Sequence, residues 1–196
     1  MREALRMILV LSLICGLSGL TLAAVRQATG PRIEEQVLTY VQGPALDQIF
    51  AAADNNPVMD RVVLDLDGET VTVFPAMVDG RLAGVAFETF GRGYGGDIGV
   101  MVGFATADGS LTGIGITTLK ETPGLGSRVV EPEFREQFGG RPGHDVALQS
   151  QGGDIAAIAG ATLSSAATVT AVNEAIHMYS RIKDRLPKDW SDQDTP

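Results

Sequence analysis

The sequence predicts an α+β protein, with a largely antiparallel sheet of hairpins, packing helices and one N-terminal transmembrane helix. Residues 7–25 carry no charged side chain, and this run is about long enough to cross a bilayer as a helix. Three Asp-Gly pairs, at 67–68, 79–80 and 108–109, each separate two β-rich runs. Asp-Gly favours the tight turn of a hairpin because both residues tolerate positive φ. Apolar residues at helical spacing over 165–186 predict a helix that packs on the sheet.

The N-terminal run is predicted to be a single-pass anchor in the cell inner membrane. Arg2 and Arg6 precede this run, and Arg26 and Arg32 follow it. The positive charge after the run is offset by Glu34 and Glu35. The positive-inside tendency keeps the stub 1–6 in the cytoplasm and places the folded domain on the periplasmic or extracytoplasmic side. A cleaved signal peptide is the main alternative, although the apolar run exceeds a usual signal-peptide core.

A helical connector is predicted over 26–56. Apolar residues between Ile33 and Ala53 recur at helical spacing, and the pattern breaks at Gly43-Pro44, where proline would begin a new helix. The β-rich runs come next and pair around the Asp-Gly turns: 62–66 with 71–74, 76–78 with 82–87, and 98–105 with 111–117.

Two helices are predicted after the strands. Residues 133–138 form a short one, with Phe134 and Phe138 one turn apart and facing the core. The helix over 165–186 packs on the sheet through five apolar positions: Val169, Val172, Ile176, Tyr179 and Ile182. Residues 187–196 are predicted to be a flexible acidic tail, in which Trp190 either docks on the domain or marks a partner contact.

Composition excludes several classes of partner and cofactor. The formal net charge of −9 leaves no basic stripe to neutralise phosphates, so nucleic acid is excluded as a partner. The same charge repels a free anionic ligand at long range, which means that such a ligand needs strong local donors or a covalent tether. Cys15 is the only cysteine and lies in the apolar run, and His144 and His177 share no ligand spacing with nearby carboxylates. No disulfide and no metal site are therefore predicted.

Two glycine-rich segments lie between the strands and the last helix. Residues 91–96 read Gly-Arg-Gly-Tyr-Gly-Gly, but a strand follows them, so they lack the context of a dinucleotide fingerprint. We expect a bend there, with Tyr94 packed inward. Residues 120–127, Lys-Glu-Thr-Pro-Gly-Leu-Gly-Ser, predict a rigid turn followed by flexible glycines. This loop places Thr122, Leu125 and Ser127 side by side, which suits a planar heteroaromatic ring.

A third small-residue segment opens the last helix. Residues 158–165 read Ile-Ala-Gly-Ala-Thr-Leu-Ser-Ser, so the Thr162 hydroxyl lies at a helix N-terminus, beside Gly160 and Ala161. Free backbone N–H groups and the helix dipole favour an anion at such a place. Ser164 and Ser165 can cap the helix or donate to phosphate oxygens. The alternative is a small-residue turn with an ordinary Ser/Thr cap.

Segments 93–98, 121–126 and 160–165, in this order behind one membrane segment, resemble the G subunit of the Rnf electron transport complex. More broadly, they resemble the FMN-binding domain that is shared with the C subunit of the sodium-translocating NADH:quinone oxidoreductase. The resemblance implies an FMN-binding domain over 57–186 and an FMN whose phosphate is joined to Thr162 by a phosphodiester bond. It implies ten cofactor-binding residues: Glu121, Thr122, Gly124, Leu125, Gly160, Ala161, Thr162, Leu163, Ser164 and Ser165.

The resemblance also implies a role. The chain would relay electrons as one component of a membrane-bound, ion-translocating ferredoxin/NAD oxidoreductase complex, with no catalytic residue or substrate-turnover site of its own. Its partners would be the other membrane and redox subunits, and a flavin transferase that uses FAD to attach the FMN. The chain departs from the family pattern at Ala159, where Ser or Thr is usual, at Ala156, where an acid is usual, and at Lys120, in place of histidine.

Two other functions stay open on the sequence. A membrane-anchored sensory or binding domain would hold the flavin without passing electrons onward. A structural protein without flavin would use Thr162 only as a helix cap.

Overall fold

A computed structural model describes residues 2–66 and 68–186, so the predicted tail and its Trp190 lie outside the described residues. Contacts divide the chain into two units, Met1–Tyr40 and Val41–Pro196. The described residues form long and short helices and a five-stranded antiparallel sheet, which confirms the predicted α+β class. The finer domain boundaries given above remain predictions.

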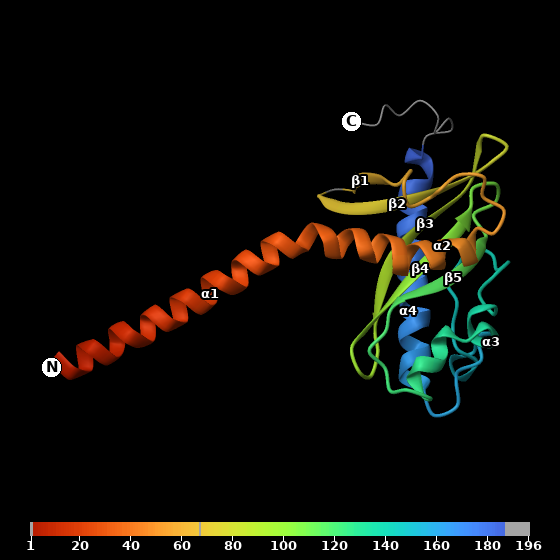
Figure 1. Ribbon diagram of the computed structural model, residues 1–196. Helices are drawn as coiled ribbons and strands as arrows, with labels where there is room; N and C mark the ends of the chain where they lie inside the picture. The colour runs from red at the N-terminus through yellow and green to blue at the C-terminus, as the bar shows by residue number, and fades with distance from the viewer. Residues whose placement is uncertain (1, 67, 187–196) are drawn as a thin grey trace. The chain divides into compact units, whose positions relative to one another are not determined.

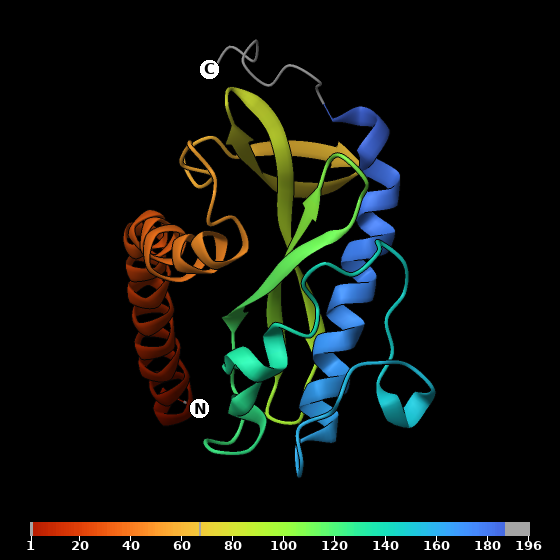
Figure 2. The same ribbon diagram turned by 90° about the vertical axis from the view of Figure 1, so that its right-hand side faces the viewer.

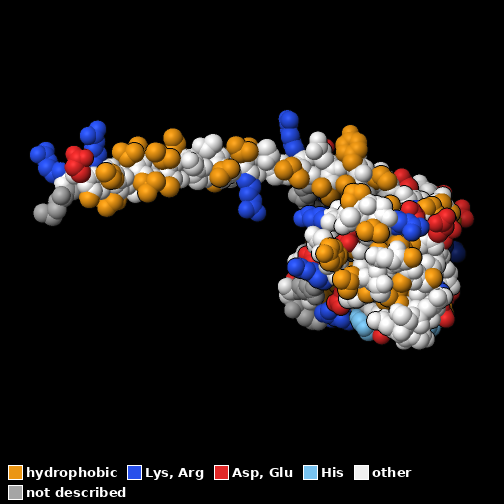
Figure 3. All heavy atoms as spheres, turned by 90° about the horizontal axis from the view of Figure 1, so that it is seen from below, with side chains coloured by type: hydrophobic (Ala, Val, Ile, Leu, Met, Phe, Trp, Pro, Cys, Tyr) orange, Lys and Arg blue, Asp and Glu red, His pale blue; other side chains and the backbone are white. Residues whose placement is uncertain are grey.

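The first unit is dominated by the helix α1, Arg2–Val37. Its hydrophobic side chains gather along the middle, and basic side chains lie toward both ends (Figure 3). It is the one helix in the described part of the chain that is long and apolar enough to cross a membrane. The helix does not end at residue 25, because the first part of the predicted connector continues it without a break.

A π-helical turn, Leu38–Gln42, leads into the short helix α2, Gly43–Ile49, which belongs to the second unit. Pro44 stands in the first turn of α2, where its missing N–H has no intrahelical partner to lose. The predicted new helix at Gly43-Pro44 is therefore confirmed. Ala45, Leu46 and Ile49 are buried where α2 packs on the sheet.

The sheet is a meander in which every strand pairs with the next one: β1 Val62–Leu66, β2 Glu69–Val78, β3 Arg81–Arg92, β4 Asp97–Ala105 and β5 Leu111–Thr118. The runs 71–74 and 76–78, expected to be separate strands, form the single strand β2. Pro75 is tolerated within it because the pairing with β1 ends at Val73. The strand then bulges between Ala76 and Met77.

The turns between the strands follow the sequence closely. Asp79 and Gly80 join β2 to β3 with φ values of 52° and 72°, the left-handed conformation that this hairpin turn needs. Gly109 has a φ of 73° between β4 and β5. The glycine-rich bend joins β3 to β4, and the Gly93 N–H donates to the Gly96 carbonyl at 2.8 Å.

The last helix, α4, spans Thr162–Ile182 and packs on β3 and β4. It lies along one face of the sheet, and α2 lies on the other (Figures 1 and 2). The five predicted contact positions of this helix are all buried. Between helix and sheet, the Phe104 ring stacks on Tyr179 at 4.4 Å and on Phe87 at 5.4 Å. Phe134 and Phe138 are also buried, as predicted, although the helix α3, Pro132–Arg135, is shorter than expected.

One glycine allows α4 to approach the sheet. A Cβ on Gly91 of β3 would lie 1.9 Å from the backbone oxygen of Ala167 on α4, so no side chain fits there. Next to it, the buried Thr89 hydroxyl donates to the Ala171 carbonyl of α4 at 2.7 Å. The start of α4 is thereby held close to the end of β3.

Candidate functional site

The three small-residue segments meet at one cavity beside the start of α4. Its volume is about 570 Å³, within the usual range for small-molecule and cofactor sites. The lining comes from all three segments: Tyr94, Glu121, Thr122, Leu125, Gly126, Gly160, Ala161, Thr162, Leu163 and Ser164. The structure thus brings together all of the predicted cofactor-binding residues except Gly124 and Ser165, and it adds Tyr94 and Gly126.

Thr162 is the first residue of α4. The residue before it, Ala161, is the N-cap and has no side-chain oxygen to accept a hydrogen bond from the first turn. Gly160 has a φ of 79°, so the chain enters the helix through a left-handed position that favours glycine. The first N–H groups of a helix lack intrahelical partners. In α4 these N–H groups belong to Thr162, Leu163 and Ser164, which all line the cavity.

The two serines that follow Thr162 do not cap the helix, which corrects that expectation. They lie at its third and fourth positions, after the N-cap, and their hydroxyls have other partners. The Ser165 hydroxyl donates to the Ala161 carbonyl and accepts from the Ile158 N–H, both at 3.0 Å. The Ser164 hydroxyl donates to the Glu121 carboxylate at 2.7 Å.

The three hydroxyls of this segment differ sharply in their exposure to solvent. Ser164 is 2% exposed and Ser165 is fully buried, whereas Thr162 is exposed. A reagent or an enzyme that approaches the cavity therefore meets only the Thr162 hydroxyl of the three. This difference in access could not be read from the sequence, in which the three hydroxyls look alike.

Tyr94 points outward, contrary to the expectation that it packs inward. It is 76% exposed and lines the cavity. The inner side of its bend has no room for a ring, because the backbone of the next segment fills it: a Cβ on Gly95 would lie 2.0 Å from the Lys120 carbonyl oxygen. Together with the exposed Leu125 and Leu163, Tyr94 gives the cavity an apolar rim.

The loop at 121–127 is closed by its own hydrogen bonds. The Leu125 and Ser127 N–H groups both donate to the Thr122 carbonyl, and the Ser127 hydroxyl accepts from the Gly124 N–H at 2.9 Å. Ser127 therefore stabilises the turn. The sequence suggested that it lies beside Thr122 and Leu125, but of these three residues only Thr122 and Leu125 line the cavity.

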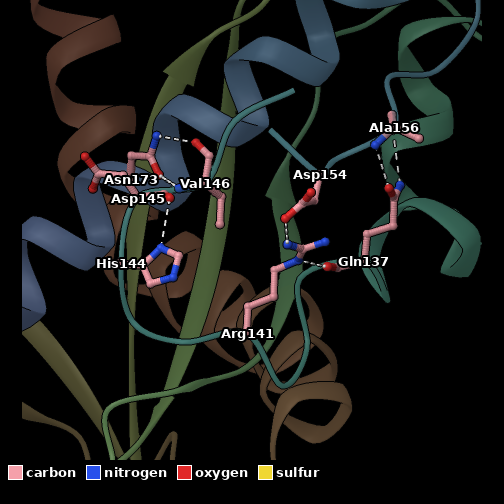
Figure 4. A network of polar contacts seen from close by, with 8 residues as sticks. All are labelled: Gln137, Arg141, His144, Asp145, Val146, Asp154, Ala156 and Asn173. Carbon is pink, nitrogen blue, oxygen red and sulfur yellow. Dashed lines mark hydrogen bonds and ion pairs between the residues drawn. The ribbon is translucent and has the colours of Figure 1, made fainter. Parts of the chain in front are cut away.

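The chain that leads to Thr162 has little regular structure and is fixed by side-chain amides (Figure 4). Asn173 of α4 bonds both the N–H and the carbonyl of Val146, at 2.8 and 2.9 Å. Gln137 does the same to Ala156, at 2.7 and 3.3 Å. Sequence patterns gave no signal for either pair. The hydrogen bonds of Asn173 and Gln137 hold the segment before the site in one position. At Ala156 they are made to the backbone, because its side chain is not polar.

The histidines lie away from the cavity. His177 Nε2 is 3.5 Å from an Asp145 carboxylate oxygen at the surface, and His144 Nδ1 contacts the Asp145 carbonyl. In the part of the chain that the structure describes, no three His, Cys, Asp or Glu side chains are grouped to hold a metal ion.

Ser165→Ala should destabilise the domain by about 1–3 kcal/mol, because it leaves the buried Ile158 N–H without an acceptor. Urea unfolding of the full-length protein in detergent measures this loss. Thr170→Ala is the matched control, since its exposed hydroxyl only bonds the carbonyl one turn back on the same helix. Equal unfolding midpoints for the two variants would contradict the assigned role of Ser165.

The segments around the cavity are similar to those of FMN-binding domains. Residues 93–177 match the FMN-binding domain family, and this range contains all three segments of the cavity. Two crystallised proteins share the fold. The C subunit of the Na⁺-translocating NADH-quinone reductase of Parabacteroides distasonis has a TM-score of 0.50 and 23% identity, over 64% of this chain and 65% of that one. NqrC of Shewanella oneidensis has a TM-score of 0.51 and 19% identity, over 69% and 71%.

Sequence relatives then define the family. The G subunit of an ion-translocating oxidoreductase complex of Methanosarcina acetivorans is 37% identical over 142 residues, which cover 71% of this chain and 75% of that protein. The corresponding G subunit of Cereibacter sphaeroides is 33% identical over 192 residues, with 91% and 85% covered. The chain belongs to this family of G subunits of ion-translocating Rnf complexes, which confirms the resemblance predicted from the motifs.

Proposed function

We propose that this protein carries an FMN joined to Thr162 by a phosphodiester bond and relays single electrons between redox centres of a membrane complex. The observation that carries the proposal is that, of the three residues Thr162, Ser164 and Ser165 at the start of α4, only Thr162 both lines the cavity and is exposed to solvent. The match of residues 93–177 to the FMN-binding domain family names the ligand class.

Attachment needs only one hydroxyl from this chain. The Thr162 oxygen would form a bond to the FMN phosphorus of FAD while the bond to the AMP oxygen breaks, and the hydroxyl proton would leave with AMP. A flavin transferase would perform this transfer, in which nothing is oxidised or reduced. The ester phosphate would then lie at the N-terminus of α4, where the first-turn N–H groups and the helix dipole stabilise an anion.

The rest of the cavity suits a flat, mostly apolar ring. Tyr94, Leu125 and Leu163 supply exposed apolar surface at its rim, and Thr122 supplies a polar side chain. FMN itself accepts and returns electrons, and the surrounding hydrogen bonds, charges and burial set its potential. A covalent tether also resolves the conflict between the net charge of −9 and retention of an anionic cofactor.

The electron donor and acceptor would be other proteins of the complex. A relative from Acetobacterium woodii is named as the G subunit of a Na⁺-translocating ferredoxin:NAD⁺ oxidoreductase complex, and it is 28% identical over 189 residues. Ion movement would belong to subunits with several spans, because residues 7–25 of this chain contain no ionisable side chain except Cys15.

The helix α1 would anchor the domain on the extracytoplasmic side in a single pass. Two arginines precede the apolar run, and the positive-inside tendency holds them in the cytoplasm. Alkaline phosphatase fused to the C-terminus of the full chain should be active in cells, because that enzyme folds only after export. An inactive fusion that is expressed at the same level would contradict this orientation.

The test of the flavin itself is expression of the full chain with and without a flavin transferase. We expect a mass gain of one FMN minus water, and fluorescence of the denatured band in a gel, only when the transferase is present. Covalent flavin alone survives denaturation. A chain that gains no mass in a host that flavinylates a known substrate would overturn the proposal.

A further inference from the structure

One carboxylate joins the three segments of the cavity. Glu121 accepts a hydrogen bond from the Ser164 hydroxyl at 2.7 Å through Oε2, and from the Gly95 N–H at 3.0 Å through Oε1. Gly95 lies 26 residues before Glu121 along the chain, and Ser164 lies 43 residues after it. Both carboxylate oxygens are thus bonded to the protein, one to the glycine-rich bend and the other to α4.

Glycines on either side leave room for this carboxylate. A Cβ on Gly126 would lie 2.4 Å from Glu121 Oε2 and 2.5 Å from the Ser164 hydroxyl, so it would separate the two groups. A Cβ on Gly93 would lie 2.4 Å from Glu121 Oε1. Gly93 and Gly126, which belong to different motifs, must therefore both lack a side chain, because the Glu121 carboxylate occupies the space beside them.

The bond to Ser164 also affects which hydroxyl is available. Ser164 is the third residue of α4, two positions after Thr162. Its proton points to Glu121 and its side chain is 2% exposed, so Glu121 holds this hydroxyl away from the open side of the cavity. A carboxylate beside the first turn of a helix is also favoured by the helix dipole.

We propose that Glu121 is a positioning residue for cofactor attachment: it fixes Ser164 and the glycine-rich bend so that Thr162 is presented as the acceptor hydroxyl. The proposal rests on the attachment of FMN to Thr162. The sequence suggested that Glu121 contacts the cofactor directly. In this proposal Glu121 acts instead through its two hydrogen bonds to the protein, one at each carboxylate oxygen. Its charge beside the cavity would also disfavour the reduced, more negative flavin.

Two substitutions of Glu121 distinguish the effect of its hydrogen bonds from the effect of its side-chain volume. Glu121→Ala removes both bonds. Glu121→Gln keeps the size and can still accept from Gly95, but its amide N–H₂ cannot accept from Ser164 and can only donate to that hydroxyl, so the Ser164 proton is no longer directed at residue 121. Glu174→Gln is the matched control, because it removes one exposed carboxylate from the outer face of α4, about 18 Å along the helix from Thr162.

The experiment measures the initial rate at which purified flavin transferase and FAD label the full chain in detergent. We expect Glu121→Ala to be labelled about tenfold more slowly than the wild type, which is the effect typical of losing hydrogen bonds to a charged group. Glu121→Gln should lie between them, and Glu174→Gln should match the wild type. Once labelled, Glu121→Gln should show a higher flavin midpoint potential, because a negative charge beside the ring is gone.

The outcomes separate this inference from the proposed function. An unlabelled wild type refutes FMN attachment altogether. A labelled wild type with Glu121→Gln at the same rate and the same potential refutes only the role of Glu121, because the isosteric variant then shows that neither the carboxylate charge nor the direction of the Ser164 proton matters. Thermal melting of each unlabelled variant checks folding. If Glu121→Ala fails to fold, Glu121→Gln alone decides.

Discussion

We expect Thr162→Ala to abolish covalent flavin incorporation and Thr162→Ser to retain it. The reason is chemical, because the phosphodiester needs an exposed hydroxyl at the first position of α4, and serine supplies the same oxygen. Intact mass and in-gel fluorescence after co-expression with the transferase measure the result. The loss should be complete in the alanine variant, since Ser164 and Ser165 are buried and already hydrogen-bonded.

Ser164→Ala is the control for this result. It removes a neighbouring hydroxyl and should leave the adduct on Thr162, formed at a lower rate because the bond between Ser164 and Glu121 is lost. Peptide mapping then locates the flavin. An adduct of undiminished yield on Thr162→Ala, at any other residue, would show that the attachment site has been placed wrongly.

Gly91→Ala should destabilise the domain by about 3 kcal/mol, the upper part of the usual range for overpacking a core. The added methyl would lie 1.9 Å from the Ala167 carbonyl oxygen, and this atom belongs to the backbone of a packed helix that cannot move aside alone. Urea unfolding of the full-length protein, followed by circular dichroism, gives the change in the free energy of unfolding.

Gly113→Ala is the matched control on β5, because its Cβ would have no neighbour nearer than the Ile49 Cα at 4.0 Å. Its stability should change by less than about 1 kcal/mol. If Gly91→Ala unfolds at the same urea concentration as this control, α4 does not lie against β3 as described.

The turns and the last helix were predictable because their signals are local. Asp79-Gly80 specifies its own turn through backbone preferences, and Val172 and Ile176 mark the buried stripe of α4 through spacing alone. The unity of β2 was not predictable in this way. A proline usually interrupts a strand. Pro75 is tolerated in β2 because the pairing with β1 ends at Val73, before the proline is reached.

The cavity shows the same limit. Each of its three segments could be singled out from its own residues, and their order carried the family resemblance. The outward direction of Tyr94 depends on backbone from residue 120, and the partner of Glu121 lies 43 residues further along the chain. Such contacts follow from how the strands and α4 pack, which no local pattern contains.

The place of Thr162 on α4 limits how a cofactor bound there could move. Most of this 21-residue helix is buried against the sheet, so its first turn, in which Thr162 and Leu163 are exposed, is held in place by the packed residues that follow it. Carriers that travel between distant centres need a long arm, whereas only the Thr162 side chain and the ribityl phosphate of the cofactor would lie between this helix and the flavin ring. Exchange of electrons would therefore require neighbouring proteins to come to this face of the domain, and the distances between centres would be fixed by assembly of the complex.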